Sequence, residues 1–246
     1  SYNHAMLKSN NSFYAFLDFS ITKFFNNNLD RIIFYTEDAY RQALENKLVT
    51  PKKAFWANNT VDETEIKKNY TFQLPLENHL TLLFIGRLIP SKRISDLINY
   101  FKILKKNIRN LKLEIIGDGP ESIIIKNAIK NNSDITWHGT LVDETDIAPI
   151  MTRSSLVFIP GLSGLSINHA FAYGRPYITL KADQHGPEIS YIKHGENGYI
   201  LEGELEENIS KFSDLLLDKE KLNAFCTRAK ETGEDLSVKM WVQQIK

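Results

Sequence analysis

A glycine-containing segment between an apolar stretch and a helical pattern combines residue types that bind phosphate. In FIPGLSGLSINHAFAYG, residues 158–174, a short strand pattern leads through Gly161 into an amphipathic helical pattern. Glycines let the backbone approach an anion closely, and the first amides of a helix have no partner inside the helix. The candidate phosphate ligands are the amides of this turn and one hydroxyl: Gly164, Leu165 and Ser166, with the Ser166 hydroxyl as an extra donor. An ordinary helix cap by Ser163 or Ser166 is compatible with this role.

Two cations follow an earlier apolar stretch and could share that ligand. Gly86 and Arg87 end LTLLFIGR, and Lys92 comes five residues after Arg87. Arginine suits bidentate contact with phosphate, and lysine adds a point charge. The alternative is a pair of solvated charges, but the carboxyl end of a buried strand is where open α/β sheets bind ligands. The sequence therefore predicts a nucleotide-diphosphate site, and more specifically one for a sugar nucleotide.

The elements that must position these residues alternate in type from residue 80 onward. Strand patterns lie at 81–86, 111–117, 134–139, 155–160, 176–180 and 195–201, and helical patterns at 95–107, 121–130, 143–154 and from the glycine turn to about 173. Helices are expected from there to the end, with a break at Gly233. Repeated strand–helix units with apolar strands predict an α/β fold with a parallel sheet and helices on both faces.

The first 68 residues form a separate pattern. Residues 13–25 have apolar side chains at helical spacing, residues 31–36 and 54–62 read as strands, and a helix is expected between those strands. This is too little for a domain with its own core, so we expect 1–68 to be the end of a domain plus a connector, and 69–246 to be a second domain. The apolar stripe of 13–25 should pack on a missing surface. In this chain it should leave an exposed patch that favours self-association.

Composition restricts the class of protein. The 246 residues contain 30 Lys+Arg and 30 Asp+Glu, which argues against nonspecific nucleic-acid binding. A single cysteine, Cys226, excludes an internal disulfide framework and a cysteine zinc cluster. The sequence has no spanning apolar run, signal-peptide pattern or Asp-x-Asp motif, so we expect a cytoplasmic protein without a metal site.

In order and spacing, these segments resemble the family-4 glycosyltransferases of the GT-B fold. The matching segments are GRLIPSK (86–92), LEIIGDGP (113–120), PGLSGLSINHAFAYGRP (160–176) and HGPEISYIKHGENGYIL (185–201), and residues 29–62 resemble the end of the N-terminal domain and the connector. Each motif alone is weak, whereas the ordered set covers nearly the whole chain. The resemblance implies two Rossmann-like domains, of which 69–246 binds the sugar nucleotide, and most of the first is expected to be missing here.

The resemblance also assigns roles to single residues. Arg87 and Lys92 would hold the donor diphosphate, and Glu188 would lie near the donor sugar, its alternative being a solvated loop acid. The family's two glutamates, which contact the donor sugar and the ribose, fall on Gly161 and His169. That sugar contact would then come from the backbone, from a neighbour such as Ser163, or from nowhere. His169 could bond the ribose or serve as a core histidine, and Gly139 would border the base pocket.

The predicted function is transfer of a sugar from a nucleotide-diphosphate donor to a glycan or lipid-linked acceptor, with retention and without a metal, in bacterial surface-polysaccharide synthesis. Arg87, Lys92 and Glu188 are the candidate catalytic residues. The chain by itself should bind nucleotide but transfer sugar poorly. Contact with the inner face of the membrane and the oligomeric state are left open. The alternatives are a noncatalytic GT-B-like binding or assembly subunit and a sugar-nucleotide epimerase of the same fold. A nicotinamide-dependent dehydrogenase is disfavoured because neither GRLIPS nor GDGPES fits G-x-G-x-x-G.

Overall fold

The chain forms two compact units, one of residues 1–60 with 238–246 and one of residues 61–237. The computed structural model describes residues 2–3, 12–75, 80–130, 132–182 and 185–245. The sequence-based division at residue 68 differs from these units in two ways. Residues 61–68 belong to the larger unit, and the last helix belongs to the smaller one.

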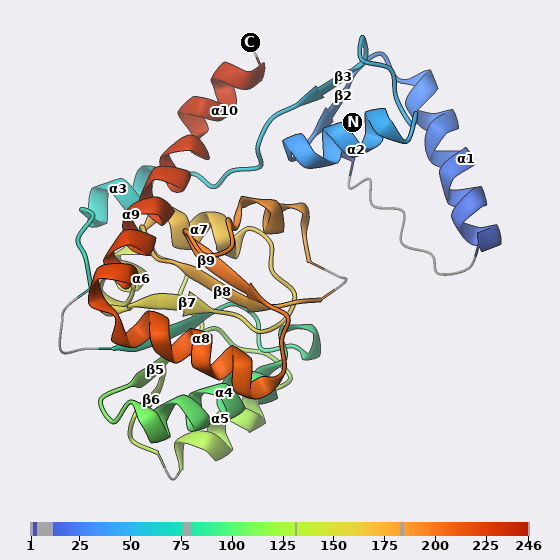
Figure 1. Cartoon of the computed structure of the whole chain (residues 1–246). Coiled ribbons are helices and arrows are strands. Elements are labelled where there is room, and N and C mark those ends of the chain that lie inside the picture. Colours follow the sequence, from blue (N-terminus) through green and yellow to red (C-terminus); the bar gives the residue numbers. More distant parts are fainter. Residues whose placement is uncertain (1, 4–11, 76–79, 131, 183–184, 246) are drawn as a thin grey trace. The chain divides into compact units, whose positions relative to one another are not determined.

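The larger unit is built on a parallel six-stranded sheet in the order β6-β5-β4-β7-β8-β9 (Figure 1). The strands are β4 (Thr81–Ile85), β5 (Lys112–Ile116), β6 (Ile135–Trp137), β7 (Leu156–Phe158), β8 (Tyr177–Leu180) and β9 (Gly198–Leu201). The chain moves outward from β4 to β6, returns to the centre at β7 and then moves outward the other way. The strand order therefore reverses between β4 and β7, which is where doubly wound folds open a crevice.

Helices cover both faces of this sheet, which confirms the predicted fold class. α4 (Ile94–Asn107), α5 (Ser122–Ile129) and α8 (Leu205–Leu217) lie on one face, and α6 (Glu144–Arg153) and α7 (Ser166–Ala172) lie on the other (Figure 1). The central strands are buried without alternation: Leu82, Leu83 and Phe84 are all fully buried. Such continuous burial is expected for a parallel sheet sandwiched between helices.

The helix α9 (Lys219–Asp235) runs without interruption through Gly233, so the predicted break there is wrong. A Cβ atom at Gly233 would lie 2.3 Å from the carbonyl oxygen of Phe171, at the end of α7. This glycine is therefore a point of close contact between α9 and α7, and a sequence pattern cannot distinguish that use from a helix end.

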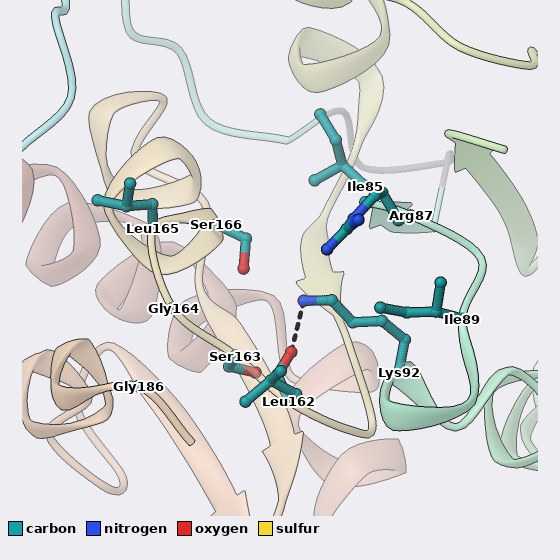
Figure 2. Close-up of a pocket in the computed structure, with 11 residues that line it drawn as sticks. Ile85, Arg87, Ile89, Lys92, Leu162, Ser163, Gly164, Leu165, Ser166 and Gly186 are labelled. Atoms are coloured by element: carbon teal, nitrogen blue, oxygen red, sulfur yellow. Dashed lines mark hydrogen bonds between the residues drawn. The ribbon is translucent and has the colours of Figure 1, made fainter. Parts of the chain in front are cut away.

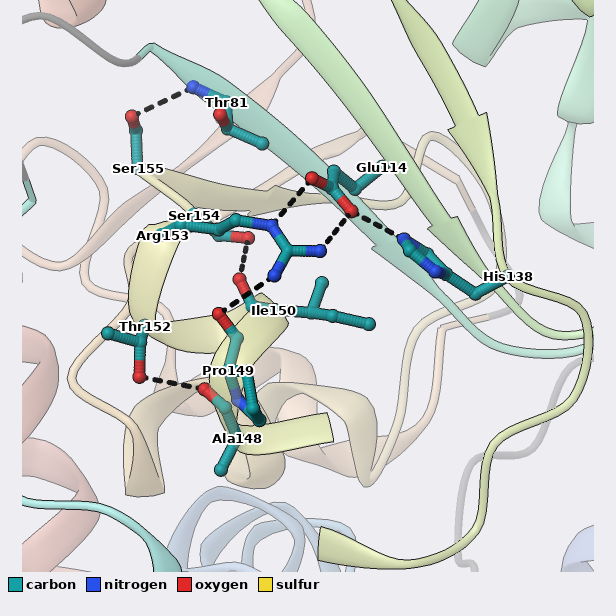
Figure 3. Close-up of polar contacts among 10 residues, drawn as sticks. All are labelled: Thr81, Glu114, His138, Ala148, Pro149, Ile150, Thr152, Arg153, Ser154 and Ser155. Carbon is teal, nitrogen blue, oxygen red and sulfur yellow. Dashed lines mark hydrogen bonds and ion pairs between the residues drawn. The ribbon is translucent and has the colours of Figure 1, made fainter. Parts of the chain in front are cut away.

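A partly buried ion cluster ties the sheet to α6 (Figure 3). The carboxylate of Glu114 on β5 accepts hydrogen bonds from Arg153 Nε at 2.7 Å and Arg153 Nη2 at 2.8 Å. His138 Nε2 lies 2.5 Å from the same carboxylate. Burial opposes ionisation of Glu114, but these partners outweigh burial and hold its pKa below the usual range.

The smaller unit contains a parallel three-stranded sheet in the order β1-β2-β3. Its strands are β1 (Tyr2–Asn3), β2 (Ile32–Phe34) and β3 (Ala54–Trp56), and its helices are α1 (Ser12–Asn28), α2 (Glu37–Glu45) and α10 (Val238–Ile245). The two-residue strand β1 was not predicted. Ile32, Phe34 and Ala43 belong to a small apolar cluster, so this piece has more of a core than expected.

The apolar patch expected on the first helix is present at its described end. On α1, the side chains of Ile21, Phe24 and Phe25 are 52%, 66% and 63% exposed. The side chains at positions 13, 16 and 17 of the predicted stripe lie outside the described part of the structure. Self-association through this patch stays a prediction. Within the described chain, no helix is both long enough and apolar enough to cross a membrane.

Candidate functional site

Two loops meet at the strand-order reversal and enclose a cavity of about 400 Å³ (Figure 2). One loop follows β4 and contains the short 3₁₀ helix η1 (Pro90–Lys92), and the other follows β7 and leads into α7. The lining residues are Ile85, Gly86, Arg87, Ile89, Lys92, Leu162, Ser163, Gly164, Leu165, Ser166 and Gly186. Seven residues predicted from the sequence are among them: Gly86, Arg87, Lys92, Ser163, Gly164, Leu165 and Ser166.

The two predicted cations stand on one wall of this cavity. Arg87 is exposed and points into the space between the loops, close to the end of Lys92 (Figure 2). Lys92 is partly buried, and its Nζ donates a hydrogen bond to the carbonyl oxygen of Leu162 on the opposite loop. Burial, and then the charge of Arg87, lower the pKa of Lys92. An anion bound between the loops would relieve this repulsion.

The residues of the glycine turn line the cavity together with the two cations. Within the described chain, the N–H groups of Gly164, Leu165 and Ser166 donate no hydrogen bond to the protein. The helix α7 has only seven residues, so its macrodipole adds little and the amides themselves are the useful donors. Two cations and three N–H groups around one cavity can hold a group with several anionic oxygens.

The backbone at Gly161 packs directly on η1. A Cβ atom at this buried position would lie 2.0 Å from the carbonyl oxygen of Ser91 and 2.7 Å from the carbonyl carbon of Lys92. The N–H of Leu162, the next residue, donates to the same Ser91 O at 2.7 Å, so a hydrogen bond joins the two loops here. Gly161 therefore does not line the cavity and no side chain fits there without moving the turn that carries Lys92.

Hydroxyl groups and one histidine hold the glycine turn from behind. Tyr177 on β8 is fully buried, and its hydroxyl lies 3.0 Å from Ser163 Oγ and 2.8 Å from Ser166 Oγ. The Ser163 N–H donates to His185 Nδ1 at 3.2 Å, and His185 Nε2 donates to the carbonyl of Leu180 at 2.9 Å. The sequence did not reveal Tyr177, because an aromatic residue in an apolar strand reads as core.

His169 is directed to a carboxylate. Its Nε2 lies 2.8 Å from Glu144 Oε1, at the start of α6, and the hydroxyl of Tyr173 donates to the other oxygen of Glu144. Burial opposes ionisation of Glu144, but hydrogen bonds from these two partners outweigh it and lower its pKa. His169 does not line the cavity, and its predicted contact with a ribose stays a prediction. Glu144 had no signal in the sequence beyond being an acid at a helix start.

Two further predicted residues lie near the cavity without lining it. Glu188, in the 3₁₀ helix η2 (Pro187–Tyr191), is 4% exposed, and its Oε2 would lie 3.6 Å from a Cβ atom on Gly164. Its carboxylate thus lies beside Gly164 and also beside Gly186, which both line the cavity. Gly139 follows β6, two strands from β4, and its carbonyl accepts from the Gly117 N–H at 2.6 Å. The roles predicted for Glu188 and Gly139 stay predictions.

In the part of the chain that is described, no group of three or more His, Cys, Asp or Glu side chains could hold a metal ion. The charged groups at the cavity are cations. The described geometry is therefore that of a site for an anionic ligand.

Comparison with known proteins finds a family model that covers most of the larger unit. The family model for glycosyl transferases group 1 matches residues 66–232. An N-acetyl-alpha-D-glucosaminyl L-malate synthase of Bacillus anthracis is 28% identical over 175 residues, which cover 70% of this chain and 44% of that protein. The chain spans between 18% and 56% of the length of the first three curated relatives it matches.

Two solved structures show how closely the fold agrees. A TarM mutant of S. aureus, in complex with Fondaparinux, alpha-GlcNAc-glycerol and UDP, has a TM-score of 0.73 at 19% identity, over 99% of this chain and 49% of that one. HepE of Anabaena, in complex with UDP, has a TM-score of 0.72 at 16% identity, over 99% of this chain and 70% of that one. At these identities the likeness concerns the fold.

Proposed function

The chain belongs to the family of glycosyl transferases group 1, and from this premise we propose that residues 61–237 are the donor-binding part of a glycosyltransferase. The enzyme would transfer a sugar from a nucleotide-diphosphate donor to a glycan or lipid-linked acceptor, with retention. The observation that carries the proposal is the cavity at the strand-order reversal. There Arg87 and Lys92 line the cavity together with the residues of the glycine turn, whose amides donate to no protein group in the described part of the chain. The smaller unit is proposed to be the end of an acceptor-side domain.

The proposed chemistry depends on the departing diphosphate. Negative charge grows on its oxygens as the glycosidic bond lengthens, and preorganised donors stabilise that charge most. Arg87 is already directed into the cavity, and Lys92 would exchange the Leu162 carbonyl for a phosphate oxygen. These two side chains supply the positive charge, so the proposal assigns no step to a metal ion. Glu188, whose carboxylate lies beside Gly164 and Gly186 of the cavity wall, is proposed to act near the donor sugar.

Uracil is the base to test first, because the TarM and HepE structures both contain UDP. Surface-polysaccharide synthesis on the cytoplasmic side of a membrane is the setting that we propose.

The test is calorimetric titration of the chain with UDP, GDP and their sugar conjugates. The Arg87→Ala/Lys92→Ala variant should lose binding by a factor of about 100 or more, since each removed charge contact to phosphate is worth about 1.5–3 kcal/mol. The matched control is Lys211→Ala/Arg228→Ala, which removes one lysine and one arginine outside the cavity whose side chains are 42% and 56% exposed. Equal affinities of the two double variants would contradict the proposed site.

A second candidate is a noncatalytic binding or assembly subunit. It is favoured by the packing at Gly161, which leaves no room for a carboxylate, and by His169 at the second glutamate position. If the chain binds none of these nucleotides, this candidate gains support. If it binds one of them through Arg87 and Lys92, the donor-site proposal stands.

A further inference from the structure

The hydroxyl of Ser166 at the cavity is oriented by a buried neighbour. Ser166 Oγ lies 2.8 Å from the hydroxyl oxygen of Tyr177, and Ser163 Oγ lies 3.0 Å from that same oxygen. The tyrosine is fully buried on β8. A single phenol group thus bonds to both ends of the glycine turn.

The direction of each hydrogen bond follows from the number of protons. A hydroxyl group has one proton to donate, and a carbonyl oxygen can only accept. Ser163 Oγ lies 3.0 Å from the carbonyl oxygen of Gly161, so Ser163 is the donor in that contact. Ser163 must then accept the proton of Tyr177. The Tyr177 hydroxyl has no second proton, so Ser166 donates to it.

The reverse order of donors is less favourable. If Ser163 donated to Tyr177, lone pairs of Ser163 Oγ and the Gly161 carbonyl would face each other at 3.0 Å. Ser163 is 1% exposed, so water could not relieve this contact. Thr179 Oγ1, at 3.3 Å, would be the remaining hydroxyl donor to that carbonyl. A buried polar contact that lacks its proton is costly, so the first order is the stable one.

We propose that Ser166 Oγ accepts a hydrogen bond from a hydroxyl of the bound donor, on the ribose or on the transferred sugar, and does not bond to a phosphate oxygen. Its own proton is used by Tyr177, so only lone pairs face the cavity. The oxygens of an ionised diphosphate also offer only lone pairs, whereas a sugar hydroxyl has a proton to donate. The diphosphate is held by Arg87, Lys92 and the amides. This inference rests on the proposed donor site and differs from the expectation that the Ser166 hydroxyl donates to phosphate.

The test compares three probes that differ in their hydroxyl groups. Inorganic diphosphate has no sugar hydroxyl, UDP has those of the ribose, and UDP-glucose adds those of the hexose. Affinities are measured for the wild-type chain, Ser166→Ala and Ser166→Thr. Ser166→Ala should weaken a hydroxyl-bearing probe by about threefold to tenfold, which is the range for one neutral hydrogen bond. Binding of inorganic diphosphate should be unchanged, and Ser166→Thr should restore the affinity because it keeps the oxygen.

The pattern over the probes identifies the hydroxyl. A loss already present with UDP places it on the ribose, and a loss seen only with UDP-glucose places it on the hexose. In the Tyr177→Phe background the Ser166 proton is released, so Ser166→Ala should now weaken binding of inorganic diphosphate as well. If Tyr177 only stabilised the fold, the Tyr177→Phe change would not alter which probes depend on Ser166.

Three results would overturn the inference. One is an equal loss of affinity for inorganic diphosphate and UDP in the single Ser166→Ala variant, and another is no loss for any probe. In both cases the Arg87→Ala/Lys92→Ala variant still separates the two proposals. If this variant loses binding, the probes bind at the proposed donor site, and only the inference about Ser166 fails. If the wild-type chain binds no probe at all, the donor site fails and this inference fails with it.

Discussion

Gly161 is the position where the structure makes the sharpest quantitative prediction. A Cβ atom there would lie 2.0 Å from Ser91 O, 2.7 Å from Lys92 C and 2.8 Å from Lys92 Cα. All three contacts are with backbone atoms, so no side-chain rotation can relieve them. Moving Ser91 O from 2.0 Å to an ordinary contact of 3.4 Å requires a displacement of about 1.4 Å, and Gly161 itself is buried, as are Ile159 and Pro160 before it.

Gly161→Ala should therefore destabilise the larger unit by about 3 kcal/mol, at the upper end of the usual range for overpacking. For a unit of this size, such a change lowers the melting temperature by about 6–12 °C. The matched control is Gly164→Ala in the same turn, where the nearest atom to the new Cβ is Glu188 Oε2 at 3.6 Å. That variant should melt within about 3 °C of the wild type, because a compatible Gly→Ala change costs nothing in the folded state.

The measurement is thermal unfolding followed by circular dichroism, with urea unfolding as a check on the free energy. Gly161→Glu, which places the family's acid at this position, should be no more stable than Gly161→Ala. The same displacement moves Lys92, so UDP affinity should fall in both Gly161 variants. If Gly161→Ala melted together with Gly164→Ala, the packing of this loop on η1 would be refuted as the reason for the glycine.

Further predictions concern the charges and the thiol. Because the pKa of Lys92 is lowered, affinity for UDP should be full while Lys92 is protonated and should fall as the pH rises, at a lower pH than for an ordinary lysine; Lys92→Arg should remove this decline in the same pH titration. Arg153→Met should cost about 1–3 kcal/mol near neutral pH, a reduced value because Arg153 is 40% exposed. The lowered pKa of Glu114 means that this advantage of the wild type exists above the ordinary glutamate pKa and disappears as the pH falls through the lowered one; equal differences at neutral and acidic pH in urea unfolding would contradict it. Burial raises the pKa of Cys226 to about 11, so a thiol reagent at about pH 8 should label it only as fast as the chain unfolds, and rapid labelling without unfolding would disprove its burial.

Much of the fold could be predicted from the sequence because its signals are local. Apolar runs bounded by glycine or proline indicated all six strands of the larger sheet to within one to three residues, as β4 and β8 show. The same reasoning located the two loops of the cavity, since a loop that follows a parallel strand must emerge at the carboxyl edge of the sheet. It failed at Gly233, where a glycine that serves a contact between helices has the same sequence appearance as one that ends a helix.

The candidate site also has one part that the sequence predicted and one part that it did not. Residue types alone determined that Arg87, Lys92 and the glycine turn could serve a phosphate, because charge, backbone freedom and order along the chain are properties of the sequence. Only the tertiary structure decided which groups lie together. It placed Tyr177 between Ser163 and Ser166, Glu144 against His169, and Ser91 where a side chain of Gly161 would be. Those contacts join residues distant in the chain at distances of about 3 Å or less, and no periodicity or motif along one sequence encodes a separation in space on that scale.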